Sequence, residues 1–405
     1  MKRKGQKKKL RLKVIITTDI ILLVILCGAL LAKGLYKSNK EEPQPETKTE
    51  SANKEGQKPE KQETPEVQET TITISAAGDC TLGTDEGFNY KRSFKGKYDA
   101  VQDPAYFFQN VQPVFAQDDL TIVNMEGTLT EETTREPKQF AFKGDAEYAK
   151  ILTAGAVETA NLANNHSFDY GKKSYEDTIT ALEAEGISSF GYERTAVMDI
   201  KGVKVGLAGV YELAEHIDCK QDLLDNIASL KEQGAQIIIV SFHWGQEKEN
   251  VPSDVQVELA HAAVDNGADL VLGHHPHVLQ GIEEYKGKNI VYSLGNFCFG
   301  GNSAPSDMDT MIFQQTFTVK DGKLQEDNVT NILPCKISSA YEKGYNNYQP
   351  ILAEGEQKEK IFERLSEYSQ KAQEAGDRLA QESAVQDKDE NSEKAANNNL
   401  ICSIF

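Results

Sequence analysis

The residues of this sequence that can carry chemistry are histidines, amides and carboxylates placed directly after short apolar runs. Five of the seven histidines have such a position, each beside a glycine or an asparagine: His166, His243, His274, His275 and His277. The apolar runs have the length and composition of buried β-strands. Because ligands of open α/β sheets bind beyond the carboxyl ends of the strands, side chains that follow different strands can converge on one site.

Carboxylates and amides follow the same kind of run. The motifs AAGDC, TIVNMEG and NLANNHSFDYG place five of them after three different runs: Asp79, Asn124, Glu126, Asn165 and Asp169. Neutral imidazoles, an amide oxygen and two carboxylates are a suitable ligand set for one or two Mn, Zn or Fe ions. Each residue alone has a structural explanation, such as a turn for Asp79 or a hydrogen-bonded core histidine for His243. Together they predict a divalent-metal site.

The sequence GHHPH contains a more specific part of this pattern. Its His275 and His277 form an H-x-H pair, and alternate residues of an extended segment point to the same side. The spacing therefore predicts two imidazoles that face one site. A solvated patch of histidines is the alternative explanation.

Other catalytic classes lack their motifs. The sequence has no G-x-S-x-G after an apolar run, as an α/β serine hydrolase requires, and no Walker loop or G-x-G-x-x-G after one. The six cysteines form no C-x-x-C pair, and Cys80 and Cys298 have no local signature of a nucleophile. These observations favour the metal site over a serine, cysteine or nucleotide-binding site.

Short apolar runs alternate with helical patterns, which predicts an α/β fold. The predicted strands are 71–77, 120–124, 157–162, 203–210, 237–242, 270–272 and 289–294. Helices are predicted at 174–185, 222–233 and 254–266, the first two ended by Gly186 and Gly234. A β-hairpin is predicted from 311–319 around Asp321-Gly322, and a last, mostly polar helix at 357–381.

The first 70 residues predict a membrane anchor and a tether. Residues 1–13 hold eight Lys or Arg and no acid, and residues 14–32 are apolar except for Asp19. This predicts a single transmembrane helix with a cytoplasmic N-terminus and an extracellular remainder, with a cleaved signal peptide as the alternative. Residues 33–70 read as a disordered linker, 71–340 as the folded domain, 341–382 as a helical extension and 383–405 as a disordered tail.

The charge excludes nucleic acid as a partner. The net charge is −19, and the basic residues 1–13 precede the predicted membrane span, so the folded domain is more acidic than the whole chain. Such a domain lacks the basic surface with which proteins bind nucleic acids. It also repels any other polyanion unless metal ions intervene.

Six motifs resemble, in order, those of the bacterial capsule synthesis protein CapA family, also called poly-γ-glutamate biosynthesis proteins. They are AAGDCTLG, NMEGTLT, NLANNHSFDYG, SFHWGQE, GHHPHVLQGIE and YSLGNFCFGG, and they span roughly residues 72 to 300. The resemblance implies the α/β sandwich of the calcineurin-like metallophosphoesterases, with two sheets flanked by helices. It also implies work beside a membrane complex that makes or exports an extracellular anionic polymer such as poly-γ-glutamate.

The resemblance further implies a role for each site residue. The metal ligands would be Asp79 and His277 for one ion, Glu126 as a bridge, and Asn165, His243 and His275 for a second ion. The general acid or charge-stabilising residue would be His166. The residues that orient ligands or substrate would be Asn124, Asp169, His274 and Asn296.

The motif around Asp79 departs from the metallophosphoesterase pattern. That pattern opens with D-x-H, whereas Asp79 is followed by Cys80 and Thr81, and Glu126 stands where an aspartate bridges. We therefore expect the first ion to bind weakly or not at all. Two functions stay open: capsule or poly-γ-glutamate synthesis or export with a divalent-metal site, or a metal-dependent phosphoesterase or hydrolase for another cell-envelope substrate. The sequence leaves open whether the protein is an enzyme.

Overall fold

The computed structural model describes the backbone of residues 69–402 and the side chains of residues 69–382. The predicted transmembrane helix at 14–32, the basic segment before it and almost the whole linker lie outside the described residues. Among the helices that are described, none combines the length and the apolar character needed to cross a bilayer.

The first of two large sheets combines strands from the N-terminal and the C-terminal parts of the domain. Its strand order is β17-β16-β14-β1-β2-β5-β6, with β13 also pairing with β1 and β15 with β14. The strands are β1 (Glu69–Thr81), β2 (Leu120–Met125), β5 (Thr159–Asn161), β6 (Ser188–Phe190), β13 (Asn296–Phe299), β14 (Asp309–Lys320), β15 (Lys323–Leu324), β16 (Val329–Lys336) and β17 (Ile351–Leu352). Strands β1, β2, β5 and β6 are parallel, whereas β14, β16 and β17 add to them in antiparallel order.

The second sheet has the order β11-β12-β10-β9-β8-β7. Its strands are β7 (Ala196–Ile200), β8 (Val203–Tyr211), β9 (Ile237–His243), β10 (Leu270–His274), β11 (Ile282–Tyr285) and β12 (Lys288–Val291). The four inner strands are parallel and the two edge strands are antiparallel to their neighbours. A small separate pair joins β3 (Thr128–Leu129) to β4 (Lys143–Gly144).

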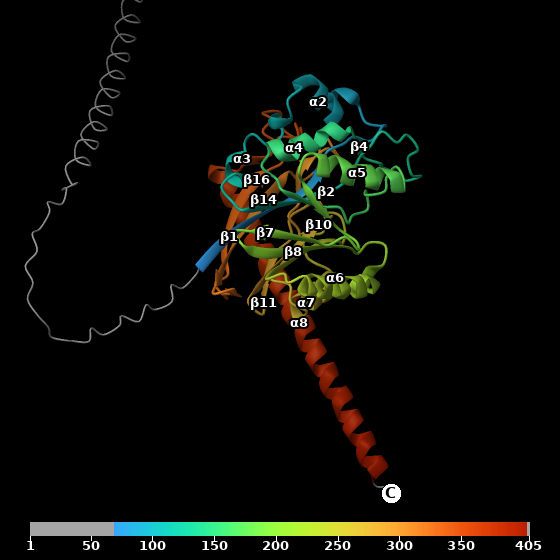
Figure 1. Cartoon of the computed structure of the whole chain (residues 1–405), viewed down its shortest axis with the longest axis vertical. Coiled ribbons are helices and arrows are strands. Elements are labelled where there is room, and N and C mark those ends of the chain that lie inside the picture. Colours follow the sequence, from blue (N-terminus) through green and yellow to red (C-terminus); the bar gives the residue numbers. More distant parts are fainter. Residues whose placement is uncertain (1–68, 403–405) are drawn as a thin grey trace, which may run out of the picture. The chain divides into compact units, whose positions relative to one another are not determined.

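Apolar side chains divide the domain into four layers. Between the two sheets lies a core to which both contribute, for example Ile74 and Ile122 from the first and Val205 and Ile239 from the second. The outer face of the first sheet is covered by α2 (Phe94–Val101), α3 (Gln112–Phe115), α4 (Ala149–Ala154) and α5 (Lys172–Ala184). The outer face of the second is covered by α6 (Lys220–Glu232), α7 (Asp254–Asp265) and the part of α8 (Gly355–Cys402) around Ala372. Figure 1 shows α2, α4 and α5 above the sheets and α6 and α7 below them.

The predicted α/β class and the predicted elements are present. The seven predicted strands correspond to β1, β2, β5, β8, β9, β10 and β12, and the three predicted helices to α5, α6 and α7. Gly186 and Gly234 follow α5 and α6 with φ of 76° and 80°, as glycines that end helices do. The turn between β14 and β15 has positive φ at both Asp321 and Gly322, which matches the predicted hairpin.

The C-terminal part differs from the prediction. Beyond residue 340 the chain still packs on the first sheet, because β17 joins this sheet and Tyr348 is fully buried against Phe94. The helix α8 packs Ile361 and Leu365 into the core and continues to Cys402, where the sequence predicted a disordered tail from 383. The composition of the tail suits a solvated segment, but its Ala, Glu, Gln and Lys also favour a helix.

Candidate metal centre

The registers of the strands bring the polar ends of β1, β2 and β13 together. Asp79 of β1 lies opposite Asn124 of β2 on one side and Asn296 of β13 on the other. The approach of β13 depends on glycine, because a Cβ at Gly78 would lie 1.9 Å from the carbonyl oxygen of Gly295. In the second sheet, His243 at the end of β9 lies opposite His274 at the end of β10. The strand ends predicted to converge therefore lie in register.

Glu126 lies at the centre of this region, just beyond β2. It is fully buried, and neither carboxylate oxygen has a hydrogen-bond partner among the described residues. Burial raises the pKa of this carboxyl to about 8. Imidazole nitrogens surround Oε1: Nε2 of His243 and of His277 at 3.8 Å each, and Nε2 of His166 at 3.9 Å. These separations are too long for hydrogen bonds.

The unpartnered atoms fit a divalent cation. Ligand atoms of Glu126, His275 and His277 all lie within 4.8 Å of one another. Atoms that bind one ion at about 2.0 to 2.2 Å are themselves about 3 to 4 Å apart. A buried carboxylate without partners is costly, and a cation among these groups would offset that cost. The Nδ1 atom of His275 is likewise buried and lacks a partner within the described part of the chain.

His277 is held from behind by hydrogen-bonding groups. Its Nδ1 lies 2.9 Å from Oδ1 of Asn296 and 3.3 Å from Oδ2 of Asp79, which leaves Nε2 facing Glu126. Burial lowers the pKa of His277, but Glu126 and Asp79 outweigh it and raise the pKa to about 9. In the absence of a cation, we therefore expect a proton on Nε2 of His277 at neutral pH.

The H-x-H pair does not lie on an extended segment, so this part of the prediction is wrong. Strand β10 ends at His274, and His275 and His277 have φ of 96° and 57°. Such left-handed conformations are costly for residues with a Cβ and cluster at functional sites. The two rings nevertheless lie 5.6 Å apart, because the chain turns twice rather than because alternate residues share a side.

Asp79 and Asn124 form a hydrogen-bonded support behind the histidines. Oδ1 of Asp79 accepts from Nδ2 of Asn124 at 2.8 Å, and its Oδ2 accepts from the backbone N–H of His275 at 3.3 Å. Burial opposes ionisation of Asp79, but the hydrogen bond and charge of His277 hold its pKa below the usual value. The amide of Asn124 also lies 3.2 Å from Nδ1 of His243. Metal-binding imidazoles commonly have such partners.

Asn165 contacts His243, and His274 lies beside Asp79. Nε2 of His243 lies 2.9 Å from Oδ1 of Asn165, and burial keeps the pKa of His243 well below the usual value. His274 is also buried, which lowers its pKa to about 4, and its Nδ1 lies 3.6 Å from Oδ1 of Asp79. Neither ring nitrogen of His274 hydrogen-bonds to any described residue. Thr81 occupies the position of the histidine in the D-x-H motif. Its hydroxyl is buried and has no hydrogen-bond partner among the described residues.

His166 and Asp169 form a hydrogen-bonded pair beside Glu126. Nδ1 of His166 lies 2.7 Å from Oδ2 of Asp169, and burial lowers the pKa of His166 although Asp169 raises it. Because Asp169 accepts a hydrogen bond from Nδ1 of His166, the other ring nitrogen, Nε2, is left facing Glu126. The structure thus brings together every residue that the sequence proposed for the site, and their individual roles stay predictions.

Two residues of the site were missed by sequence reasoning. Asn161, at the end of β5, donates from Nδ2 to Oδ1 of Asn124 at 3.0 Å, and its place after an apolar run was a usable signal. Lys138 contacts Asp169 from a loop without regular structure, and no motif indicated it. Cys80 is no nucleophile, because burial raises its pKa to about 12.

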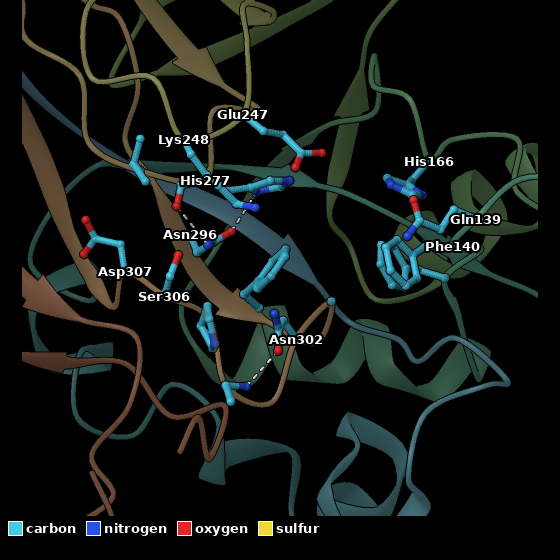
Figure 2. Close-up of a pocket in the computed structure, with 16 residues that line it drawn as sticks. Gln139, Phe140, His166, Glu247, Lys248, His277, Asn296, Asn302, Ser306 and Asp307 are labelled. Carbon is cyan, nitrogen blue, oxygen red and sulfur yellow. Dashed lines mark hydrogen bonds between the residues drawn. The ribbon is translucent and has the colours of Figure 1, made fainter. Parts of the chain in front are cut away.

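A cavity of about 590 Å³ opens beside the cluster. Figure 2 shows Glu247, Lys248 and His277 on one side of it and His166, Gln139 and Phe140 on the other. Asn296, Ser306 and Asp307 form a further wall. His166 and His277 both line the cavity, so a molecule bound there can reach these two imidazoles.

Comparisons with known proteins identify similar sequences. The model of the family described as bacterial capsule synthesis protein PGA_cap matches residues 73–301, more than half of the chain. The PGA biosynthesis protein CapA of Bacillus subtilis (strain 168) is 29% identical over 263 residues, 59% of this chain and 67% of that protein. The capsule biosynthesis protein CapA of Bacillus anthracis is 31% identical over 254 residues, 56% of this chain and 60% of that protein.

More distant proteins are also similar. A probable polyglutamine synthesis accessory protein of Mycobacterium tuberculosis is 28% identical over 210 residues, 44% of this chain and 55% of that protein. The matches thus span between about half and two thirds of these relatives. A hypothetical protein of Thermus thermophilus with a solved structure has a TM-score of 0.39 and 14% identity, covering 65% of this chain and 98% of that one.

Proposed function

The chain belongs to the bacterial capsule synthesis protein family, and we propose that it acts in the synthesis or export of an acidic extracellular polymer of the poly-γ-glutamate type through a divalent-metal centre. The relatives named for PGA and capsule biosynthesis support the process. The observation that carries the metal centre is Glu126, a buried carboxylate that has no hydrogen-bond partner in the described chain and faces three imidazoles.

The proposal extends to place and partners. Residues 14–32 anchor the protein, and the domain works outside the cell beside a membrane complex that makes or exports the polymer. The acidic composition of the chain supports a need for cations, since an anionic polymer would otherwise be repelled. Manganese, zinc or iron suits the imidazole and carboxylate donors.

A second candidate is metal-dependent hydrolysis, either of the polymer itself or of a phosphoester in the cell envelope. The observation that favours it is the pair of His166 and Asp169 beside the proposed metal ligands, since an imidazole held by a carboxylate can transfer a proton. A bound divalent ion would supply Lewis-acid activation of a carbonyl or phosphoryl oxygen. Asp169 holds the Nδ1 proton of His166, and Nε2 takes up and returns a proton on the side of Glu126.

Complementation of polymer production tests the proposal. A producing strain that lacks its own copy receives the full chain, Glu126→Gln, His166→Ala or the control His216→Ala, whose side chain is 74% exposed. We expect polymer yield from the wild type and the control and none from Glu126→Gln. Normal yield from Glu126→Gln would refute the metal-dependent role. Loss with His166→Ala favours hydrolysis, whereas normal yield with His166→Ala favours a role in holding the polymer.

A further inference from the structure

Lys138, which belongs to none of the predicted motifs, contacts three residues of the site. Its Nζ lies 2.6 Å from the backbone oxygen of Asn165, 2.7 Å from Oδ1 of Asp169 and 3.3 Å from Nδ1 of His166. The Asp169 side chain is fully buried, whereas that of Lys138 is 31% exposed. A single ammonium group thus reaches three neighbouring residues of the NNHSFD segment.

We propose that Lys138 is a positioning residue that holds His166 and Asn165 in their places around the metal centre, an inference that rests on the proposed function. Asp169 accepts from Lys138 at one oxygen and from His166 and the backbone N–H of Phe142 at the other. An ammonium can only donate, so its approach to Nδ1 of His166 adds no hydrogen bond to a protonated Nδ1. Lys138 acts instead through Asp169: its ammonium group holds the carboxylate in position and stabilises the negative charge of that carboxylate.

The second contact of Lys138 reaches the other side of the centre. The backbone carbonyl of Asn165 accepts a hydrogen bond from Lys138, which fixes the backbone of Asn165. The side-chain Oδ1 of Asn165 lies 2.9 Å from Nε2 of His243. The residue that handles a proton and a residue predicted to bind metal are therefore held by the same cation. A shift of His166 would change its 3.9 Å separation from Oε1 of Glu126.

Lys138 is not needed merely to fasten its own loop. The loop between β3 and β4 has several other attachments, among them Lys143 Nζ to the backbone oxygen of Glu132 at 2.7 Å, Arg135 to Asp85 at 2.9 Å, and the backbone N–H of Glu136 to the backbone oxygen of Asp169 at 2.8 Å. Lys143 provides a matched control, since it binds the same loop and contacts neither His166 nor Asp169 within the described hydrogen bonds.

The test compares Lys138→Met, Lys138→Arg and Lys143→Met in the purified full chain. ¹⁵N-histidine NMR of the seven histidines reads the tautomer and hydrogen bond of His166, which is assigned with His166→Ala. We expect a protonated Nδ1 in the wild type and Lys143→Met, a lost or exchange-broadened Nδ1 signal in Lys138→Met, and its return in Lys138→Arg. Cleavage of bis-p-nitrophenyl phosphate and of poly-γ-glutamate should show kcat reduced about 10- to 100-fold in Lys138→Met, with KM little changed. Mn²⁺ affinity should fall as well, because Asn165 loses the group that holds its backbone.

The outcomes separate this inference from the proposed function. An unchanged His166 spectrum in Lys138→Met, or the same change in Lys143→Met, would overturn the positioning role. If wild type cleaves neither probe while its His166 signal still depends on Lys138, the positioning role stands and hydrolysis of these two substrates is refuted. Should Lys138→Met fail to fold, Lys138→Arg decides, since a missing Nδ1 signal in that folded, charged variant contradicts the inference.

Discussion

Oε1 of Glu126 and Nε2 of His277 lie 3.8 Å apart without a hydrogen bond, although Glu126 is fully buried and the His277 side chain is only 19% exposed. The charge of Glu126 raises the pKa of His277, and the charge of His277 lowers that of Glu126. That separation is wide for a hydrogen-bonded ion pair and suits two ligands of one cation. The groups behind them, Asn296 and Asp79, fix the imidazole so that its free nitrogen points at the carboxylate. The relationship explains why an unpaired carboxylate persists in the core.

Replacing Glu126 should remove metal-dependent stabilisation. In wild type, Mn²⁺ at about 100 times its Kd stabilises the fold by about 2.7 kcal/mol, a rise in Tm of roughly 4 °C for a domain of this size. Glu126→Gln keeps the shape but loses the negative ligand, so we expect its Tm to change little with Mn²⁺. Differential scanning calorimetry with and without the ion measures this. An equal rise in the variant would place the ion elsewhere.

Metal affinity should increase with pH. In the absence of an ion the pKa of His277 is raised to about 9, so below that pH a proton occupies the nitrogen that an ion needs. Binding must release this proton and also that of the Glu126 carboxyl, whose pKa is raised to about 8, so the apparent affinity should rise at least about tenfold per pH unit between pH 6 and 8. Titration calorimetry in buffers of different ionisation enthalpy counts the protons released. An affinity independent of pH over this range would argue against His277 as a ligand.

Asn124 should matter for both folding and metal binding. It donates to Asp79 and accepts from Asn161, and Asn124→Ala leaves these buried groups unsatisfied, which costs about 2 kcal/mol or more. Because Asp79 and His243 lose a partner that orients them, Mn²⁺ affinity should fall about 10- to 100-fold. Urea unfolding and titration calorimetry measure the two effects. Asn266→Ala, which removes one bond at the end of α7, should leave metal affinity unchanged.

Gly78 should tolerate no side chain. An alanine Cβ there would lie 1.9 Å from the carbonyl oxygen of Gly295, to which Asp79 donates its backbone N–H at 2.9 Å. Gly78→Ala must therefore separate β1 from β13, and we expect at least about 3 kcal/mol of lost stability. Gly202→Ala is the control, because its positive φ costs about 1 kcal/mol and its Cβ would meet no described atom within 4 Å. Similar urea midpoints for both variants would contradict this packing argument.

The predictable part of the fold is the part set by local pattern. Apolar runs that end in Asp79, Asn124 or His243 identified the strands and, through the rule of strand ends, the residues that meet. The backbone of His275 and His277 was not predictable, because positive φ at a histidine is imposed by neighbouring structure rather than preferred by the residue. The prediction of an extended segment assumed the usual negative φ at His275 and His277, and this assumption was wrong.

Lys138 and α8 show two other limits. Lys138 reaches the site from a loop whose path is set by long-range contacts, and a lysine among polar residues carries no periodic signal. For α8, composition alone could not separate a solvated tail from a polar helix, since the same residues serve both. Long-range packing and mixed composition are therefore where the sequence was least informative.

The most direct test of the metal centre is the metal content of the purified full chain, determined by elemental analysis after equilibration with Mn²⁺, Zn²⁺ or Fe²⁺ and removal of free ions. We predict about one or two equivalents per chain in the wild type, reduced in His275→Ala, whose buried Nδ1 lacks a partner among the described residues, and retained in His216→Ala. A wild-type chain that retains no metal under any of these supplies would contradict the account.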